Sequence, residues 1–236
     1  GVTTCHPHNN NKGPQEMTHD YSPTAETYGD FQTAYQALNM ALFDGRLPDV
    51  MFTLARTRHA NGYIIPEGFN QITGASDAQS VAEIGLNPET FAERTAEQVL
   101  STIAHEMVHF DQHLNGKPSP YGYHNKEFAR LMLDIGLQTS DTGKPGGRPV
   151  GPHMTHYVIE GGRFQREAQD LIAQGWALRY ASPVMTDDAK QRKTARKASK
   201  TKYHCFHCGA NAWARPGARI ACGEHGDALP TMHAHD

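Results

Sequence analysis

His105-Glu106-Met107-Val108-His109 places two imidazoles and one carboxylate within five consecutive residues. In an α-helix, residues four apart lie on the same face one turn apart, so both histidines can reach a single metal ion. Glu106 lies next to the first histidine, where a carboxylate can hold and deprotonate a water molecule on that ion. The stretch therefore predicts a helix that carries part of a metal site and its base.

The residues on either side of this motif predict the helix itself. Thr95 and Gln98 form a capping box, in which Thr95 caps the first turn and the Gln98 side chain reaches back. Apolar residues then recur at helical spacing and give the helix a face to bury: Val99, Leu100, Ile103, Met107, Val108 and Leu114. Asn115-Gly116 ends the helix, and Pro118 prevents its continuation. We expect a half-buried helix at the floor of a cleft.

A catalytic zinc site has three protein ligands and one open position, whereas a structural site is closed by four. His113 lies about 12 Å along the helix axis from His105, so one ion cannot bind His105, His109 and His113 together. His124 is the better third ligand, because a turn at residues 117–120 and a second helix can bring it back over the first pair. The alternative is a histidine that merely begins the second helix.

Three stretches resemble the SprT-like metalloprotease family: residues 38–48 (LNMALFDGRLP), 101–109 (STIAHEMVH) and 122–129 (GYHNKEFA). The family includes the Spartan protease, which degrades proteins crosslinked to DNA. Its members share a helix with two zinc-binding histidines and a catalytic glutamate, then a third histidine before a helix that carries a phenylalanine. The resemblance implies a zincin-like peptidase with His105, His109 and His124 as zinc ligands and Glu106 as the catalytic residue. It also implies that an edge strand of the sheet lines the cleft and pairs with an extended substrate.

The order of predicted elements indicates an α+β fold with a small, mostly antiparallel sheet. The sequence pattern predicts helices at residues 23–44, 95–115, 125–135 and 163–174, and strands at 50–54, 62–65, 82–86, 154–159 and 176–180. The Gly/Pro-rich stretch at 142–152 is interpreted as a flexible loop. Tyr157 has a hydroxyl that can stabilise an oxyanion, but a buried structural tyrosine is the favoured interpretation.

Composition divides the chain of 236 residues into four predicted parts. These are a polar disordered tail (1–22), a metalloprotease domain (23–182), a basic linker (183–202) and a zinc ribbon with its tail (203–236). No apolar run is long enough to cross a membrane, and no signal-peptide pattern begins the chain. Three of the four cysteines crowd together at metal-ligand spacings, which favours a reducing compartment over disulfides. We expect a cytoplasmic monomer, associated with the nucleoid if the host is bacterial.

Cys205-Phe206-His207-Cys208 and Cys222-Gly223-Glu224-His225 predict a second, structural zinc site. Cys205, Cys208, Cys222 and His225 would form a tetrahedral set, and the metal would supply the folding free energy of so small a module. The family's ribbon usually ends in a fourth cysteine, so His204 and His207 remain alternatives to His225. We expect Phe206 to lie in the small core of this module.

Seven basic residues and no acidic one lie between residues 189 and 202: Lys190, Arg192, Lys193, Arg196, Lys197, Lys200 and Lys202. Such a run is either a solvated linker or a segment that binds phosphates. Trp213 and Arg215 add a ring for base stacking and a charge for phosphate. The candidate DNA-binding residues are Lys193, Arg196, Lys197, Lys200, Lys202, Trp213 and Arg215.

These patterns and the resemblance together predict a zinc-dependent endopeptidase with one catalytic and one structural Zn²⁺. Its expected partners are protein substrates that are associated with or crosslinked to DNA, and DNA itself, especially single-stranded. Two alternatives remain open. One is a DNA-binding or regulatory zinc protein without proteolytic activity, against which Glu106 argues, because a structural site needs no base. The other is a general peptidase unrelated to DNA.

Overall fold

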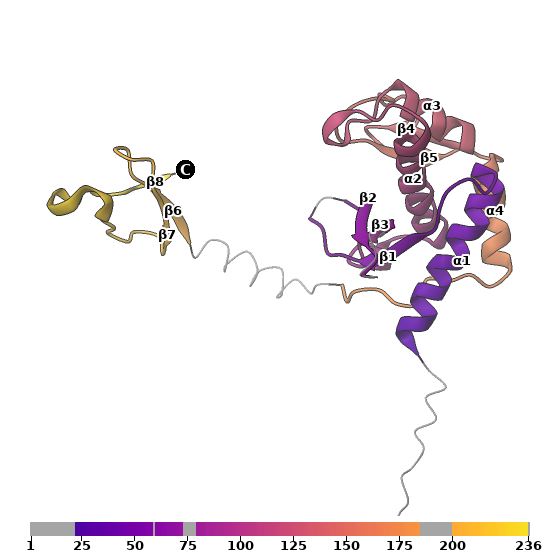
Figure 1. The fold of residues 1–236 in the computed structure, drawn as a ribbon, viewed down its shortest axis with the longest axis horizontal. Coiled ribbons are helices and arrows are strands. Elements are labelled where there is room, and N and C mark those ends of the chain that lie inside the picture. Colours follow the sequence, from indigo (N-terminus) through magenta and orange to yellow (C-terminus); the bar gives the residue numbers. More distant parts are fainter. Residues whose placement is uncertain (1–21, 59, 73–78, 185–199, 236) are drawn as a thin grey trace, which may run out of the picture. The chain divides into compact units, whose positions relative to one another are not determined.

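The computed structural model describes residues 22–58, 60–72, 79–184 and 200–235. The chain divides into two compact units, Gly1–Ser182 and Pro183–Asp236. Helices and small sheets occur together in the first unit, which confirms the α+β class (Figure 1). Among the described residues, no helix combines the length and the apolar character needed to span a bilayer.

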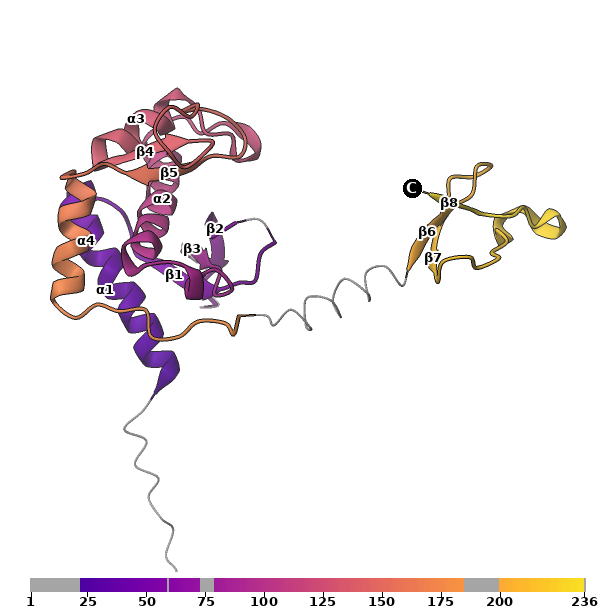
Figure 2. The same cartoon turned by 180° about the vertical axis from the view of Figure 1, so that it is seen from behind.

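The helices of the first unit are α1 (Pro23–Phe43), α2 (Ala96–Asn115), α3 (Lys126–Ile135) and α4 (Arg163–Ala173). The predicted capping box of α2 is confirmed: the Gln98 backbone N–H donates to Thr95 Oγ1 (3.2 Å), and the Thr95 N–H donates to Gln98 Oε1 (2.9 Å). Figures 1 and 2 show α1 and α4 side by side. Both pack against α2, which is buried along most of its length and therefore holds its side chains in fixed positions.

The main sheet contains β1 (Val50–Leu54), β2 (Gly62–Asn70) and β3 (Ser80–Leu86) in the order β1-β3-β2. The mostly antiparallel sheet that we expected is instead mixed, because β3 pairs parallel with β1 and antiparallel with β2. β3 lies between the two earlier strands. It runs opposite to β2 and in the same direction as β1. This arrangement leaves β2 at an edge of the sheet.

A second, antiparallel sheet joins β4 (Leu137–Ser140) to β5 (Thr155–Val158). β4 was not expected from the sequence. The strand predicted at residues 176–180 is wrong, because this segment is anchored to α1 by side chains instead of a ladder. Trp176 Nε1 donates to the Asp30 carbonyl (2.7 Å), Arg179 Nε donates to the Asp30 carboxylate (2.7 Å), and Tyr180 Oη donates to Glu26 (2.9 Å).

One hydrophobic core holds the first unit together, and each of its large side chains contributes about 1.5–3 kcal/mol by burial. Every helix of this unit and the main sheet supply fully buried members, among them Tyr35, Leu38, Ile84, Leu100, Ile103, Met107, Phe128, Met132 and Phe164. On α2, Met107 lies between the two motif histidines, and Ile103 lies two residues before the first of them. Packing at these positions therefore fixes where the polar side chains of α2 point.

The second unit is a three-stranded antiparallel sheet with a very small core. Its strands are β6 (Thr201–His204), β7 (Asn211–Ala214) and β8 (His233–His235), in the order β7-β6-β8. Tyr203, Cys205, Cys222 and Met232 form the buried cluster. The expectation that Phe206 belongs to this core is wrong, because its side chain is 73% exposed. It contacts the rings of His204 and His233 instead.

Candidate metal centre

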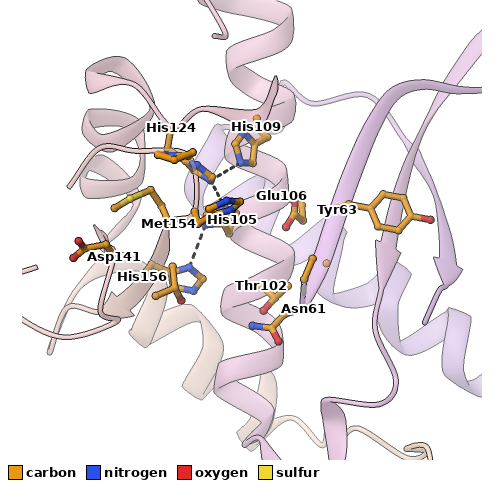
Figure 3. A pocket seen from close by; sticks show the side chains of 16 residues that line it. Asn61, Tyr63, Thr102, His105, Glu106, His109, His124, Asp141, Met154 and His156 are labelled. Atoms are coloured by element: carbon orange, nitrogen blue, oxygen red, sulfur yellow. Dashed lines mark hydrogen bonds between the residues drawn. The ribbon is translucent and has the colours of Figure 1, made fainter. Parts of the chain in front are cut away.

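The three histidines predicted to bind one metal ion converge at the side of α2 (Figure 3). The Nε2 atom of His124 lies 3.1 Å from His109 Nε2 and 3.2 Å from His105 Nε2, and one ligand atom from each residue lies within 4.8 Å of the others. In a tetrahedral zinc site with Zn–N distances of 2.0–2.1 Å, two ligand nitrogens lie about 3.3 Å apart. The spacing of the three imidazoles therefore fits a single zinc ion. His113 is exposed and lies outside this group.

His124 is held in place by backbone pairing with Gly151. The His124 N–H donates to the Gly151 carbonyl (2.9 Å), and the Gly151 N–H donates back (3.1 Å). The His124 ring nitrogen Nδ1 lies 3.3 Å from the same carbonyl, which can only accept, so Nδ1 carries the hydrogen and Nε2 keeps its lone pair. The stretch at 142–152, interpreted as a flexible loop, thus has a defined role in placing the third histidine.

The buried surroundings keep these histidines neutral. Burial, followed by the neighbouring imidazoles, holds the pKa of His105 well below its usual range. Burial and His124 lower the pKa of His109 to about 3. The pKa of His124 is also lowered, chiefly by burial. A metal binds imidazole only in its neutral form, so the three rings are in the state that a zinc ion requires.

Glu106 is buried beside these rings, at the place where α2 faces β2. Burial raises the pKa of its carboxyl group to about 8. A cation bound by the neighbouring imidazoles would favour the ionised carboxylate and so act against this effect. The site therefore contains an acid–base group whose protonation depends on the charge beside it.

A pocket of about 480 Å³ opens over the histidines. Residues of α2 form one wall, Asn61 and the start of β2 at Gly62 form another, and residues 152–156 form a third. In Figure 3 the Tyr63 ring points away from the histidines, and its hydroxyl donates to Glu83 (2.7 Å). A Cβ atom on Gly62 would lie 2.9 Å from Thr102 Cγ2 and 3.3 Å from Glu106 Oε1. The glycine therefore lets the edge strand approach α2 closely.

His156 is a residue of this site that the sequence analysis missed. It lies on β5 and lines the pocket, with Nδ1 3.1 Å from His105 Nδ1 and Nε2 2.9 Å from Ser101 Oγ. Burial, then Arg94 and His124, lower its pKa to about 4. Tyr157, the neighbour that the sequence analysis did consider, is not among the residues that line the pocket. The available signal was strand alternation, which turns residues 156 and 157 to opposite faces.

In the second unit, Cys205, Cys208, Cys222 and His225 bring their ligand atoms within 4.8 Å of one another. Cys205 Sγ lies 3.4 Å from His225 Nε2, and Cys208 Sγ lies 3.6 Å from Cys222 Sγ. A disulfide needs about 2.05 Å between its sulfur atoms, whereas two ligands of a tetrahedral zinc with Zn–S of 2.3 Å lie about 3.8 Å apart. The arrangement therefore fits a metal and not a disulfide.

Of the three histidines considered as the fourth ligand, His225 is the one that joins the cysteines. His204 Nδ1 contacts Asn211 Oδ1 (3.1 Å), and the His207 ring packs on the His225 ring with 5.6 Å between centroids. Burial opposes ionisation of the Cys205 thiol, but the backbone N–H groups of Cys208 and His207 outweigh it. They help to lower the pKa of Cys205 to about 6, toward the thiolate that a metal binds.

The candidate DNA-binding residues are described only in part. Lys193, Arg196 and Lys197 lie outside the described residues. Lys200 and Arg215 are exposed, and Lys202 is half-buried. Trp213 is 63% exposed and pairs with Lys202 across β6 and β7.

A model of the SprT-like family matches residues 31–147, a range that contains the three converging histidines and Glu106. A curated relative, an uncharacterized protein in the mucB 3' region of Salmonella typhimurium, is 37% identical over 62 residues. The matched segment covers 26% of this chain and 80% of the relative. No solved structure matches the chain significantly.

Proposed function

Because this chain belongs to the SprT-like family, we propose that it is a zinc-dependent endopeptidase that cleaves proteins associated with or crosslinked to DNA. The observation that carries the peptidase assignment is the convergence of His105, His109 and His124 in a pocket that Glu106 also lines. Three imidazoles leave one position of a tetrahedral zinc open, as catalytic sites require. A purely structural site would need a fourth protein ligand.

Zinc held by the three histidines would supply a Lewis acid that lowers the pKa of a water molecule and polarises a peptide carbonyl. Glu106 then acts as general base and takes a proton from the attacking water at its carboxylate. The same carboxyl group, now protonated, donates that proton to the amine nitrogen as the peptide bond breaks. Burial raises the pKa of Glu106 and a bound cation would lower it again, and this balance suits a group that must first accept and then release a proton.

The edge strand β2 is the proposed substrate platform of this zincin-like domain. Gly62 at its start and Asn61 just before it line the pocket, and the N–H and C=O groups on the free edge of a strand can pair with an extended peptide. Pairing of this kind recognises the backbone and requires no particular side chain. Proteins would therefore be chosen as substrates because they are held close to the protease, and their amino-acid sequence would matter little.

The second unit is proposed to be a zinc ribbon that binds DNA together with the basic linker. Its support is chemical: an exposed Trp213 ring beside Lys202, and an exposed Arg215 two residues further along the chain. Alternation along β7 exposes Asn211 and Trp213 while residues 212 and 214 are half-buried, and Arg215 just after the strand is exposed as well. An aromatic ring flanked by cations is suited to stack on a base and to bind the phosphates of a single strand.

The test compares the wild type with Glu106→Gln in metal content and in cleavage of casein or histone, with and without single-stranded DNA. We expect equal metal content, cleavage by the wild type only, and faster cleavage of histone when DNA is present. Trp213→Ala should weaken DNA binding while DNA-independent cleavage of casein persists.

Each alternative function predicts a different result. A wild type that binds both metals and cleaves neither protein under any condition is a DNA-binding or regulatory zinc protein. Cleavage that DNA does not accelerate, with no salt-sensitive affinity for DNA, identifies a general peptidase.

A further inference from the structure

A chain of hydrogen bonds runs from His105 back to the first turn of its own helix. His105 Nδ1 lies 3.1 Å from His156 Nδ1, His156 Nε2 lies 2.9 Å from Ser101 Oγ, and Ser101 Oγ lies 2.9 Å from the Gln98 carbonyl oxygen. Figure 3 shows the His156 ring below that of His105, on the side opposite His124. The contact spans 51 residues of sequence, because His156 comes from β5.

The last member of this chain fixes the direction of every hydrogen bond in it. A carbonyl oxygen can only accept, so the Ser101 hydroxyl donates to Gln98. Ser101 must then accept from His156, which places the His156 hydrogen on Nε2 and leaves a lone pair on Nδ1. His105 must therefore carry its hydrogen on Nδ1. The opposite direction would put the His105 hydrogen on Nε2, the nitrogen that faces His109 and His124.

We propose that His156, held by Ser101, is a positioning residue that fixes the tautomer and the ring orientation of His105 for metal binding. The proposal rests on the zinc site proposed above. His105 Nε2 then presents a lone pair to the metal, and the ring cannot rotate without breaking the bond to His156. Metal-bound histidines usually donate their second ring nitrogen to an oxygen acceptor in this way. Here the acceptor is another imidazole, whose own tautomer is set by a serine.

The geometry argues against a direct catalytic role for His156. Both of its ring nitrogens are engaged, one by His105 and the other by Ser101. It therefore has no free donor for a developing oxyanion, although it lines the pocket. Its contribution to the reaction passes through His105.

The predicted effect is on metal affinity, which is measured without any substrate. Replacing a hydrogen-bond partner of a metal ligand typically lowers affinity about 10–100-fold. His156→Leu removes the acceptor and keeps an apolar side chain, so we expect a loss in this range. His156→Asn should recover part of the affinity, because its Oδ1 atom can take the place of Nδ1. Ser101→Ala should lower metal affinity less. It removes the hydroxyl that holds the His156 hydrogen on Nε2, but the His156 ring stays beside His105.

The experiment titrates the full-length protein with Co²⁺ in competition with a chromophoric chelator. Co²⁺ at the cysteine site gives a thiolate-to-cobalt charge-transfer absorption, and Co²⁺ at the histidine site does not. The occupancy of the two sites can therefore be followed separately in the same titration. Tyr157→Leu is the matched control, because it changes the same strand on its other face. Equal Co²⁺ affinity at the histidine site in wild type, His156→Leu and Ser101→Ala would overturn the proposal.

A second measurement needs no variant and so does not depend on whether His156→Leu folds. Long-range nitrogen NMR of the zinc-loaded wild type should place the ring hydrogens on His105 Nδ1 and His156 Nε2. A hydrogen on His156 Nδ1 would contradict the proposal. Neither readout involves cleavage, so a protein with these tautomers and affinities that fails to cut proteins would refute the proposed function alone.

Discussion

Arg46 and Asp111 form a bidentate ion pair that joins the turn after α1 to α2, the helix that carries His105 and His109. Arg46 Nε donates to Asp111 Oδ1 (2.9 Å), and Nη2 donates to Oδ2 (2.7 Å). The Asp111 side chain is only 4% exposed, whereas that of Arg46 is 42% exposed. Asp111 follows His109 by two residues, so the pair anchors α2 close to the metal centre.

Replacing Arg46 with methionine should destabilise the first unit by about 1–3 kcal/mol, because the buried Asp111 carboxylate would lose its charged partner. The loss is smaller than for a fully buried ion pair, because the exposed face of Arg46 is screened by solvent. Chemical denaturation monitored by the buried Trp176 measures the effect. Arg130→Met is the matched control, since its pair with Asp134 is exposed and contributes about 0.5 kcal/mol or less. Equal losses for the two variants would contradict the anchoring role.

Glu106→Gln should change the pH dependence of stability in metal-free protein. Burial raises the pKa of Glu106 from 4.5 to about 8, so the folded protein keeps a proton that the unfolded chain releases. The stability from this proton is complete below pH 4.5 and is lost as the pH rises through about 8. Glutamine cannot ionise. The unfolding free energy of Glu106→Gln relative to wild type should therefore rise across this range, by on the order of a few kcal/mol.

Trp176 fluorescence in chelator and denaturant at several pH values tests this expectation. Glu93→Gln, which changes an exposed carboxylate on a neighbouring turn, is the control. A stability difference that stays constant with pH would show that Glu106 is hydrated. A difference that falls as the pH rises would mean that folding lowers the pKa of Glu106 instead of raising it.

Gly62→Ala should impair both stability and cleavage. The new Cβ would lie 2.9 Å from Thr102 Cγ2 and 3.1 Å from the Gly85 carbonyl oxygen, so β2 must move away from α2. Such overpacking costs about 1–3 kcal/mol, and it displaces the proposed substrate strand from Glu106. Adding Thr102→Ser removes the methyl group and should restore part of both losses. Gly29→Ala, on an open helical surface, should instead be neutral or slightly stabilising.

Chelation should unfold the second unit while Trp176 in the first unit remains buried. The core of the second unit consists of Tyr203, Met232 and two cysteines, so metal ligation supplies most of its folding free energy. His225→Ala should lower its metal affinity strongly, whereas His225→Cys should retain the metal. His207→Ala is the control, because His207 touches His225 only through its ring. A stronger effect of His207→Ala than of His225→Ala would reassign the fourth ligand.

The parts of the site that local spacing determines could be predicted from the sequence. The capping box at Thr95 and Gln98 and the four-residue spacing of His105 and His109 depend only on helix geometry. His124 was predicted from the turn and the second helix that can bring it back over α2, and the family resemblance implied the same ligand. His156 could not be predicted in the same way, because strand alternation places residues 156 and 157 on opposite faces but does not indicate which of the two faces α2.

The fold shows the same division between local and distant determinants. The bounds of β1 at Val50–Leu54 follow from local pattern and are confirmed. The parallel pairing of β1 with β3 depends on which strand inserts between the others, and the composition of the strands does not encode this. The segment around Trp176 has the composition of a strand, but side-chain anchors to α1 decided its conformation.

The three imidazoles that converge are close in sequence, and this has a consequence for the order of folding. His124 is 15 residues from His109 and 19 from His105, whereas Arg46 and Asp111 are 65 residues apart. The entropic cost of closing a loop grows with its length, and contacts close in sequence form fastest. α2, the turn and α3 can therefore bring the three imidazoles together before the sheet is complete. Bound metal would then act as a template on which the later contacts from α1 and β5 assemble.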